Sequence, residues 1–224
     1  MQAELKQENP MVEGVIWRQM LNFFFPILLG TFFQQMYNTA DALIVGRILG
    51  ESALAAVGGS AGIITMTVVG FFMGLTSGAS IIAAQMLGAK DRESVNDSIH
   101  TIYAFSLLAG IILTIAGIPL TEKMLLWLNT PQSIMRASEE YLWVYFAGLV
   151  FVLIYNTGAS ILRSLGDAKH PFISLIVCCV INVVLDYVLI AWFHMGIAGA
   201  AVATVIAQAI SAVLVTVRLI RSKE

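Results

Sequence analysis

The sequence predicts an all-α integral membrane protein, a bundle of six transmembrane helices, and three observations support this fold class. The 224 residues are 58% hydrophobic and only 12% charged, and their mean hydropathy is +0.85. The charged residues gather in short segments, at 1–18, 90–97, 121–140, 163–170 and 218–224. Between these segments lie mostly apolar runs of 18 or more residues, which is the length that crosses a bilayer.

The apolar runs give the spans in chain order, at 17–42, 54–84, 99–119, 139–162, 172–193 and 197–219. The second run is longer than one crossing needs, so it holds either a tilted helix with an interfacial turn or a break. Residues 1–16 are polar and acidic and lack the short apolar region of a removable signal peptide. We therefore expect an N-terminal cytoplasmic segment at 1–16, one six-helix lobe at 17–219 and a basic tail at 220–224.

Lysine and arginine residues divide unevenly between the two sides of this bundle. Because the cytoplasmic loops of membrane proteins carry an excess of Lys and Arg, the richer side is predicted to be cytoplasmic. Both termini then lie in the cytoplasm of a multi-pass protein of the inner (plasma) membrane. The richer side holds Lys6, Arg18, Lys90, Arg92, Arg163, Lys169, Arg218, Arg221 and Lys223, and the poorer side holds Arg47, Lys123 and Arg136.

Two aspartates lie inside predicted spans, Asp41 in the first and Asp186 in the fifth. Insertion of an aspartate at the centre of a span costs about 2.5–3.5 kcal/mol. A hydrogen bond between membrane helices returns only about 0.6 kcal/mol, so a purely structural role explains such residues poorly. Carboxyl groups removed from water exchange protons readily, and two of them together can hold a monovalent cation. We interpret the pair as a site for H⁺ or Na⁺.

Other polar residues of the first span share the face of its aspartate. Gln34, Tyr37, Asn38 and Asp41 follow one another at offsets of 0, 3, 4 and 7, which places them on one side of a helix. Pro26 lies within the same span, where it removes a backbone hydrogen bond and predicts a helix bend.

In the fifth span, Asn182 precedes Asp186 by one helical turn, on the same face. Three further polar residues, Tyr141, Asn156 and Thr204, are candidates for the same site, although such side chains often only join helices. Tyr145 and Gln208 are expected to serve packing alone.

Glycines of the second span keep a spacing that often lets membrane helices approach closely. They are Gly58, Gly62, Gly70, Gly74 and Gly78. We expect them to pack this span into the bundle.

Three segments resemble the MATE (multidrug and toxic compound extrusion) family. ILRSLGDAKHP at 161–171 is similar to the family's L-R-G-x-G-D-x-K-x-P loop between spans four and five, with Ser164 where glycine is usual. YNTADALIVGRILGESALAAVG at 37–58 resembles the end of the first span and the loop after it. GLTSGASIIAAQMLGAKD at 74–91 resembles the second span and the next loop. The segments keep the order and spacing of the family over essentially the whole chain.

The resemblance implies a secondary transporter that exports organic cations in exchange for inward H⁺ or Na⁺, with no other cofactor. It also implies that Asp41, Asn182 and Asp186 match the family's cation site in the N-terminal lobe. The residues that resemble the polar groups around that site are Gln34, Tyr37, Tyr141, Asn156 and Thr204.

Family members usually have twelve spans in two lobes, whereas this chain equals one lobe. The expected partners are therefore organic cations, the lipid bilayer and a second lobe. Homodimerisation in parallel or a missing C-terminal half would supply that lobe.

Other functions are open from the residues alone. One is an isolated cation-binding lobe without transport. Another is a flippase of lipid-linked oligosaccharides from the same superfamily, although the spans hold almost no Lys or Arg away from their ends. The contexts NTADAL and VVLDYV fit neither motif of an intramembrane aspartyl protease. No motif of another enzyme or of a nucleic-acid-binding protein occurs, so neither activity is expected.

Overall fold

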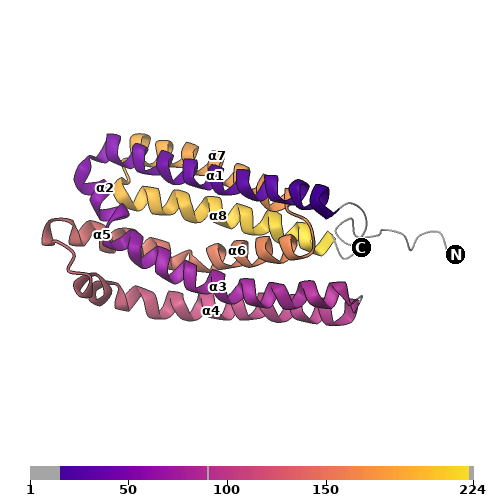
Figure 1. Ribbon diagram of the computed structural model, residues 1–224. Coiled ribbons are helices and arrows are strands. Elements are labelled where there is room, and N and C mark those ends of the chain that lie inside the picture. Colours follow the sequence, from indigo (N-terminus) through magenta and orange to yellow (C-terminus); the bar gives the residue numbers. More distant parts are fainter. Residues whose placement is uncertain (1–15, 90, 222–224) are drawn as a thin grey trace.

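The computed structural model describes residues 16–89 and 91–221, which form helices joined by short connections (Figure 1). In chain order these are α1 (Ile16–Leu49), α2 (Glu51–Gly58), α3 (Ser60–Gly88), α4 (Arg92–Trp127), α5 (Gln132–Ala147), α6 (Leu149–Ser164), α7 (Lys169–Tyr187), the π-helical turn η1 (Val188–Trp192) and α8 (Gly196–Arg221). These residues contain no strand, and the predicted all-α class is confirmed. Most of the expected N-terminal segment and of the basic tail lie outside the described residues.

The long helices run side by side, so the bundle has two ends (Figure 1). At one end α1 begins, α3 connects to α4, α6 connects to α7 and α8 finishes, and we call it the terminal end. The connections of α1 to α2, α4 to α5 and η1 to α8 lie at the opposite, distal end. The described chain therefore passes along the bundle six times, at the positions of the six predicted spans.

Composition alone supports fewer spans than this topology. Four described segments are long and apolar enough to cross a membrane by themselves, at 51–88, 93–127, 169–192 and 196–221. The pair of α5 and α6 makes a fifth, bent by 55°. At 34 residues α1 is long enough, but its polar face lowers its mean hydropathy. Three residues of that face, Gln34, Tyr37 and Asp41, are also predicted to bind a cation.

Two of the predicted spans are broken rather than continuous. The second is interrupted at Gly59, between α2 and α3, although residues 51–88 together still form one apolar segment. The fourth, expected as one helix over 139–162, begins at Gln132 and divides at Gly148. A Cβ atom at Gly148 would collide with the side chain of Val205 on α8. Close packing against α8 therefore accounts for a glycine at this break.

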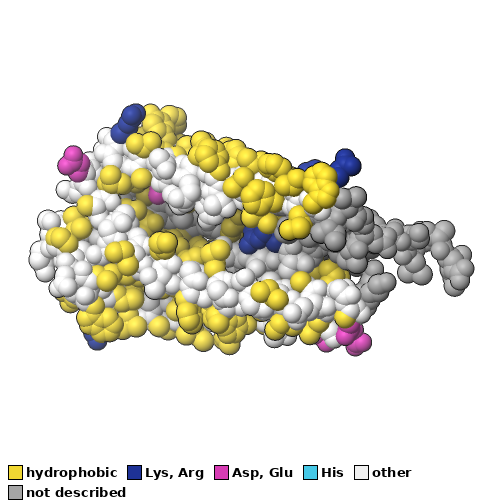
Figure 2. All heavy atoms as spheres, in the orientation of Figure 1, with side chains coloured by type: hydrophobic (Ala, Val, Ile, Leu, Met, Phe, Trp, Pro, Cys, Tyr) yellow, Lys and Arg dark blue, Asp and Glu magenta, His cyan; other side chains and the backbone are white. Residues whose placement is uncertain are grey.

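The inner helix of the bundle is α8, which packs against α5, α6 and α7 (Figure 1). Its fully buried positions are small residues such as Ala200, Ala203 and Ala207, which let neighbouring helices approach closely. Large apolar side chains cover much of the outside instead (Figure 2). Phe71 and Ile115, for example, are exposed. An apolar exterior of this kind is suited to contact with lipid.

The predicted role of the glycines in the second span is wrong for most of them. A Cβ atom would have no neighbour within 4 Å at Gly58, Gly70, Gly74 or Gly78. Close approaches between helices occur at other glycines, such as Gly117 on α4, where a Cβ atom would lie 2.6 Å from the ring of Phe146. Spacing alone therefore did not identify the packed face.

Candidate cation-binding site

The two intramembrane aspartates meet where α1 packs beside α7 (Figure 1). Asp41 and Asp186 face one another within hydrogen-bonding reach. Asp186 is 0% exposed, whereas Asp41 is partly exposed and lines a cavity of about 530 Å³ near the distal end. Asn182 is central in the fifth span, and Asp186 lies one turn closer to the distal end.

Asn182 holds the α7 carboxyl group in place and connects it to α8. With its amide nitrogen toward Asp186, Asn182 donates to Asp186 Oδ2 at 2.8 Å and accepts from the Thr204 backbone N–H at 3.3 Å. Asp41 Oδ1 and Asp186 Oδ1 are buried and have no hydrogen-bond partner among the described residues. Because unpaired buried oxygens are unfavourable, the carboxyl pair has capacity for a further proton or cation.

Two tyrosines complete this cluster. Tyr37 lies one turn before Asp41 on α1, hydrogen-bonds with Thr204 on α8, and interacts electrostatically with Asp41. Tyr141 on α5 interacts electrostatically with both Asp41 and Asp186. The fold thus gathers polar groups from four helices around the carboxyl pair.

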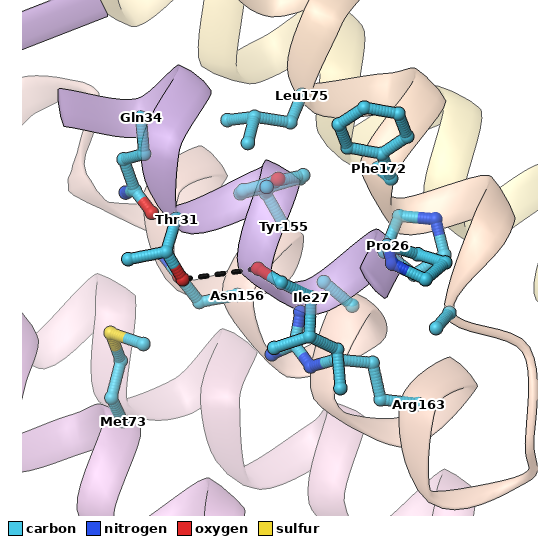
Figure 3. A pocket seen from close by; sticks show the side chains of 14 residues that line it. Pro26, Ile27, Thr31, Gln34, Met73, Tyr155, Asn156, Arg163, Phe172 and Leu175 are labelled. Atoms are coloured by element: carbon cyan, nitrogen blue, oxygen red, sulfur yellow. Dashed lines mark hydrogen bonds between the residues drawn. The ribbon is translucent and has the colours of Figure 1, made fainter. Parts of the chain in front are cut away.

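Three predicted site residues lie away from this cluster, along a second pocket shown in Figure 3. Gln34 lines both cavities, since it lies between the aspartates and the terminal end. Asn156 donates to the backbone oxygen of Val152 in its own helix at 2.8 Å. Pro26 lines the pocket wall, and α1 continues through it as one helix. A functional bend at Pro26 stays a prediction.

The geometry of the cluster limits what it can do chemically. Two facing carboxyl groups in a buried setting cannot both carry a charge without a compensating cation. They therefore either share a proton or hold a cation between them, and oxygen ligands suit a hard cation such as Na⁺. The π-helical turn η1 begins two residues after Asp186, and such turns are frequent at functional sites.

Sequence reasoning left out two residues that line the cavities, Tyr145 and Arg163, and a third, Gln208, whose side-chain oxygen is buried elsewhere. Tyr145 lines the cavity beside Asp41, and its ring stacks on that of Tyr141 with centroids 6.0 Å apart. Gln208 carries a buried Oε1 atom without a partner among the described residues. Arg163, assigned to a loop, lines the second pocket from the last turn of α6. Because the apolar run continues to Leu162, the sequence alone indicated that Arg163 directly adjoins the span.

Comparisons with known proteins agree on one family. The MatE family profile matches residues 26–188. A probable multidrug resistance protein of Bacillus subtilis, YpnP, is 35% identical over 199 residues, which are 89% of this chain and 44% of the relative. A second from the same organism, YoeA, is 34% identical over 212 residues, or 93% of this chain and 46% of the relative.

Solved structures agree with these relatives. An outward-facing multidrug resistance MATE family transporter of the MOP superfamily matches with a TM-score of 0.89 at 26% identity. The match covers 97% of this chain and 48% of that transporter. The chain spans about half the length of the curated relatives it matches. Since the family profile covers most of the chain and the fold is that of half a solved MATE transporter, this chain belongs to the MATE family of multidrug efflux transporters.

Proposed function

We propose that this chain is the ion-binding lobe of a secondary antiporter that exports organic cations in exchange for inward H⁺ or Na⁺. The observation that carries the proposal is the facing Asp41–Asp186 pair, in which each carboxyl group has one buried oxygen without a partner among the described residues. An arrangement so costly in an apolar bundle is explained if a cation regularly occupies and leaves it. The names of the relatives, probable multidrug resistance proteins, support the export of drugs.

The pair couples ion binding to the packing of α1 against α7. A bound proton or cation removes the repulsion between Asp41 and Asp186, so the two helices pack closely. When the ion leaves, the repulsion returns and favours a different position of α1, which the missing backbone hydrogen bond at Pro26 makes easier to bend. Ion and substrate then compete through this change of conformation, which is alternating access.

The direction of transport follows from the charges at the two ends of the bundle. We place the terminal end in the cytoplasm of the cell membrane because cytoplasmic ends carry more Lys and Arg. Basic residues at that end include Arg18, Arg92, Arg163, Lys169, Arg218 and Arg221. The working transporter needs a second lobe, which a second copy of this chain in parallel or a C-terminal half supplies. Cross-linking in membranes tests the first of these, since only pairing of copies gives a dimer of this chain.

Ion binding by the purified chain tests the site without requiring transport. In mild detergent the wild type should bind radioactive sodium in competition with protons, or release protons on a pH jump that the variant does not release. Asp186→Asn should lose this behaviour because it leaves a single carboxyl group. Asp97→Asn, at an exposed carboxylate on α4, is the matched control and should behave as wild type. Identical ion binding by wild type and Asp186→Asn would contradict the assignment.

A further inference from the structure

A second pocket of about 250 Å³ lies between α1, α6 and α7, on the terminal side of Gln34 (Figure 3). On the same face of the molecule, Figure 2 shows a hollow along the middle of the bundle, with a basic side chain inside it. The pocket is smaller than the usual cavity for a drug-sized ligand, which is about 300–1,000 Å³. Its polar side chains are Thr31, Gln34, Tyr155, Asn156 and Arg163.

Arg163 brings a full positive charge into this pocket. It forms no ion pair with any described residue. It interacts electrostatically with Tyr155, which lies about two turns earlier on α6. In Figure 3 the guanidinium group points among the side chains that line the pocket. A guanidinium group withdrawn from water is unfavourable unless an anion or hydrogen-bond acceptors compensate it.

The carboxylate nearest to Arg163 in the sequence, that of Asp167, is already paired with other residues. The His170 backbone N–H donates to Asp167 Oδ1 at 3.1 Å, and His170 Nδ1 lies 2.8 Å from the same oxygen. Arg218 Nε donates to Asp167 Oδ2 at 3.1 Å. These bonds fix the carboxylate between the start of α7 and the end of α8. Arg163 is therefore left without that partner although it lies only four residues away.

Other basic residues at the terminal end behave differently. Arg18, Lys169 and Arg221 are exposed, as expected for side chains that extend to the water at a membrane surface. Arg218 is paired with Asp167. Among these residues, Arg163 alone is both partly buried and without a carboxylate partner within the described chain. The preference of Lys and Arg for the cytoplasmic side explains the excess of positive charge at the terminal end. It does not explain why the Arg163 charge is directed into a cavity.

We propose that this pocket binds a phosphate group, with the Arg163 guanidinium as its charge partner. A guanidinium group presents paired N–H donors that match two oxygens of a phosphate. Asn156 donates one amide N–H to Val152, and its second amide N–H has no partner among the described residues. The Gln34 amide lines the same cavity. The small volume fits a headgroup-sized oxyanion rather than a whole drug.

The apolar wall of the pocket indicates what is attached to the phosphate. Ile27, Phe172 and Leu175 face the cavity in Figure 3 and suit an acyl chain or a ring. A phospholipid headgroup and a soluble organic phosphate share this chemistry. The pocket is distinct from the cation pair because it lies nearer the terminal end of the bundle, although Gln34 lines both cavities.

Phosphate binding is measured on the full chain in mild detergent, with two kinds of probe. Phosphatidic acid is compared with diacylglycerol, its counterpart without the phosphate, by quantifying the lipid that remains bound after gel filtration. Phenyl phosphate is compared with phenol by titration against the thermal unfolding temperature. Binding of phosphatidic acid alone identifies a lipid headgroup as the source, and displacement of the lipid by phenyl phosphate identifies a soluble organic phosphate.

Arg163→Gln should weaken binding of the phosphate probes by about tenfold or more, because it removes the charge and keeps a polar side chain. Arg163→Lys should recover part of the affinity, since it restores the charge without the paired donors. Lys169→Gln, an exposed basic position in the same connection, should bind as wild type. Equal affinities of the folded wild type and Arg163→Gln, or no binding of either phosphate probe by the wild type, would overturn the proposal.

Discussion

Asp167 links the start of α7 to the end of α8, and its replacement by alanine should destabilise the terminal end of the bundle. The carboxylate accepts hydrogen bonds from the His170 backbone N–H, from His170 Nδ1 and from Arg218 Nε. Its side chain is 21% exposed, and those of His170 and Arg218 are 41% and 40% exposed. Solvent therefore screens these charges in part, and the full value of a buried ion pair does not apply.

The size of the effect follows from this partial exposure. A hydrogen bond to a charged group contributes about 1.5–3 kcal/mol when it is well buried. With the ion pair screened, we expect a loss of about 1–2 kcal/mol for the whole set of interactions. One kcal/mol corresponds to about 2–4 °C in a domain of this size, so the apparent Tm should fall by about 2–8 °C.

The effect should depend on pH in a defined direction. Partial burial raises the pKa of the Asp167 carboxyl, but the hydrogen bonds from His170 and Arg218 outweigh it and hold the net pKa below its ordinary value. A carboxyl group with a lowered folded-state pKa stabilises the fold above its unfolded pKa, and that stability is lost as the pH falls through the folded value. Wild type and Asp167→Ala should therefore differ at neutral pH and converge below about pH 4.

Thermal unfolding in detergent, followed by circular dichroism across this pH range, measures both quantities. Lys169→Ala alters an exposed residue of the same connection and should leave the apparent Tm close to that of the wild type. The reasoning is refuted if Asp167→Ala unfolds at the wild-type temperature near neutral pH. It is equally refuted if the two proteins still differ by the neutral-pH amount well below about pH 4.

Two pairs of substitutions test the polar cluster and the helix packing, each followed by thermal unfolding in detergent. Asn182→Leu should lower stability by about 1–3 kcal/mol because Asp186 loses its amide donor. Asn156→Leu should lower it less, since that amide bonds only within α6, and equal losses would count against the proposed network. Gly117→Ala should cost about 1–3 kcal/mol because its Cβ atom would lie 2.6 Å from an aromatic ring of α5. Gly74→Ala meets open space and should be neutral or gain up to about 1 kcal/mol, so a loss at both glycines would contradict the packing described.

The topology and the carboxyl pair were predictable because both follow from the cost of placing a group in lipid. Apolar runs between charged segments gave the six passes of the chain along the bundle. The free-energy cost of placing an aspartate within a span identified Asp41 and Asp186 as site residues. Helical spacing then assigned Asn182 and Tyr37 to the same site. These arguments need only local sequence, so they do not depend on which helices become neighbours.

Features that depend on contacts between helices were not predictable in the same way. The break at Gly148 reflects the position of Val205 on α8, more than fifty residues further along the chain. Glycine spacing in the second span suggested a packed face, yet Gly74 has no neighbour. From the sequence, Arg163 resembled an ordinary residue of a cytoplasmic loop. It lacks Asp167 as a partner because that carboxylate pairs with Arg218, which comes from a different helix. Sequence spacing contains none of this information.

The most direct test of the central claim is efflux of a fluorescent organic cation from proteoliposomes that contain only this chain. Proton and sodium gradients are imposed in turn, with Asp186→Asn and Asp97→Asn measured beside the wild type. The account predicts efflux driven by one of the gradients in the wild type and in Asp97→Asn, and none in Asp186→Asn. Efflux by Asp186→Asn at the wild-type rate would contradict a coupling role for the carboxyl pair. No efflux by the wild type under either gradient would contradict transport by paired copies, and would favour a second lobe from a C-terminal half or an isolated cation-binding lobe.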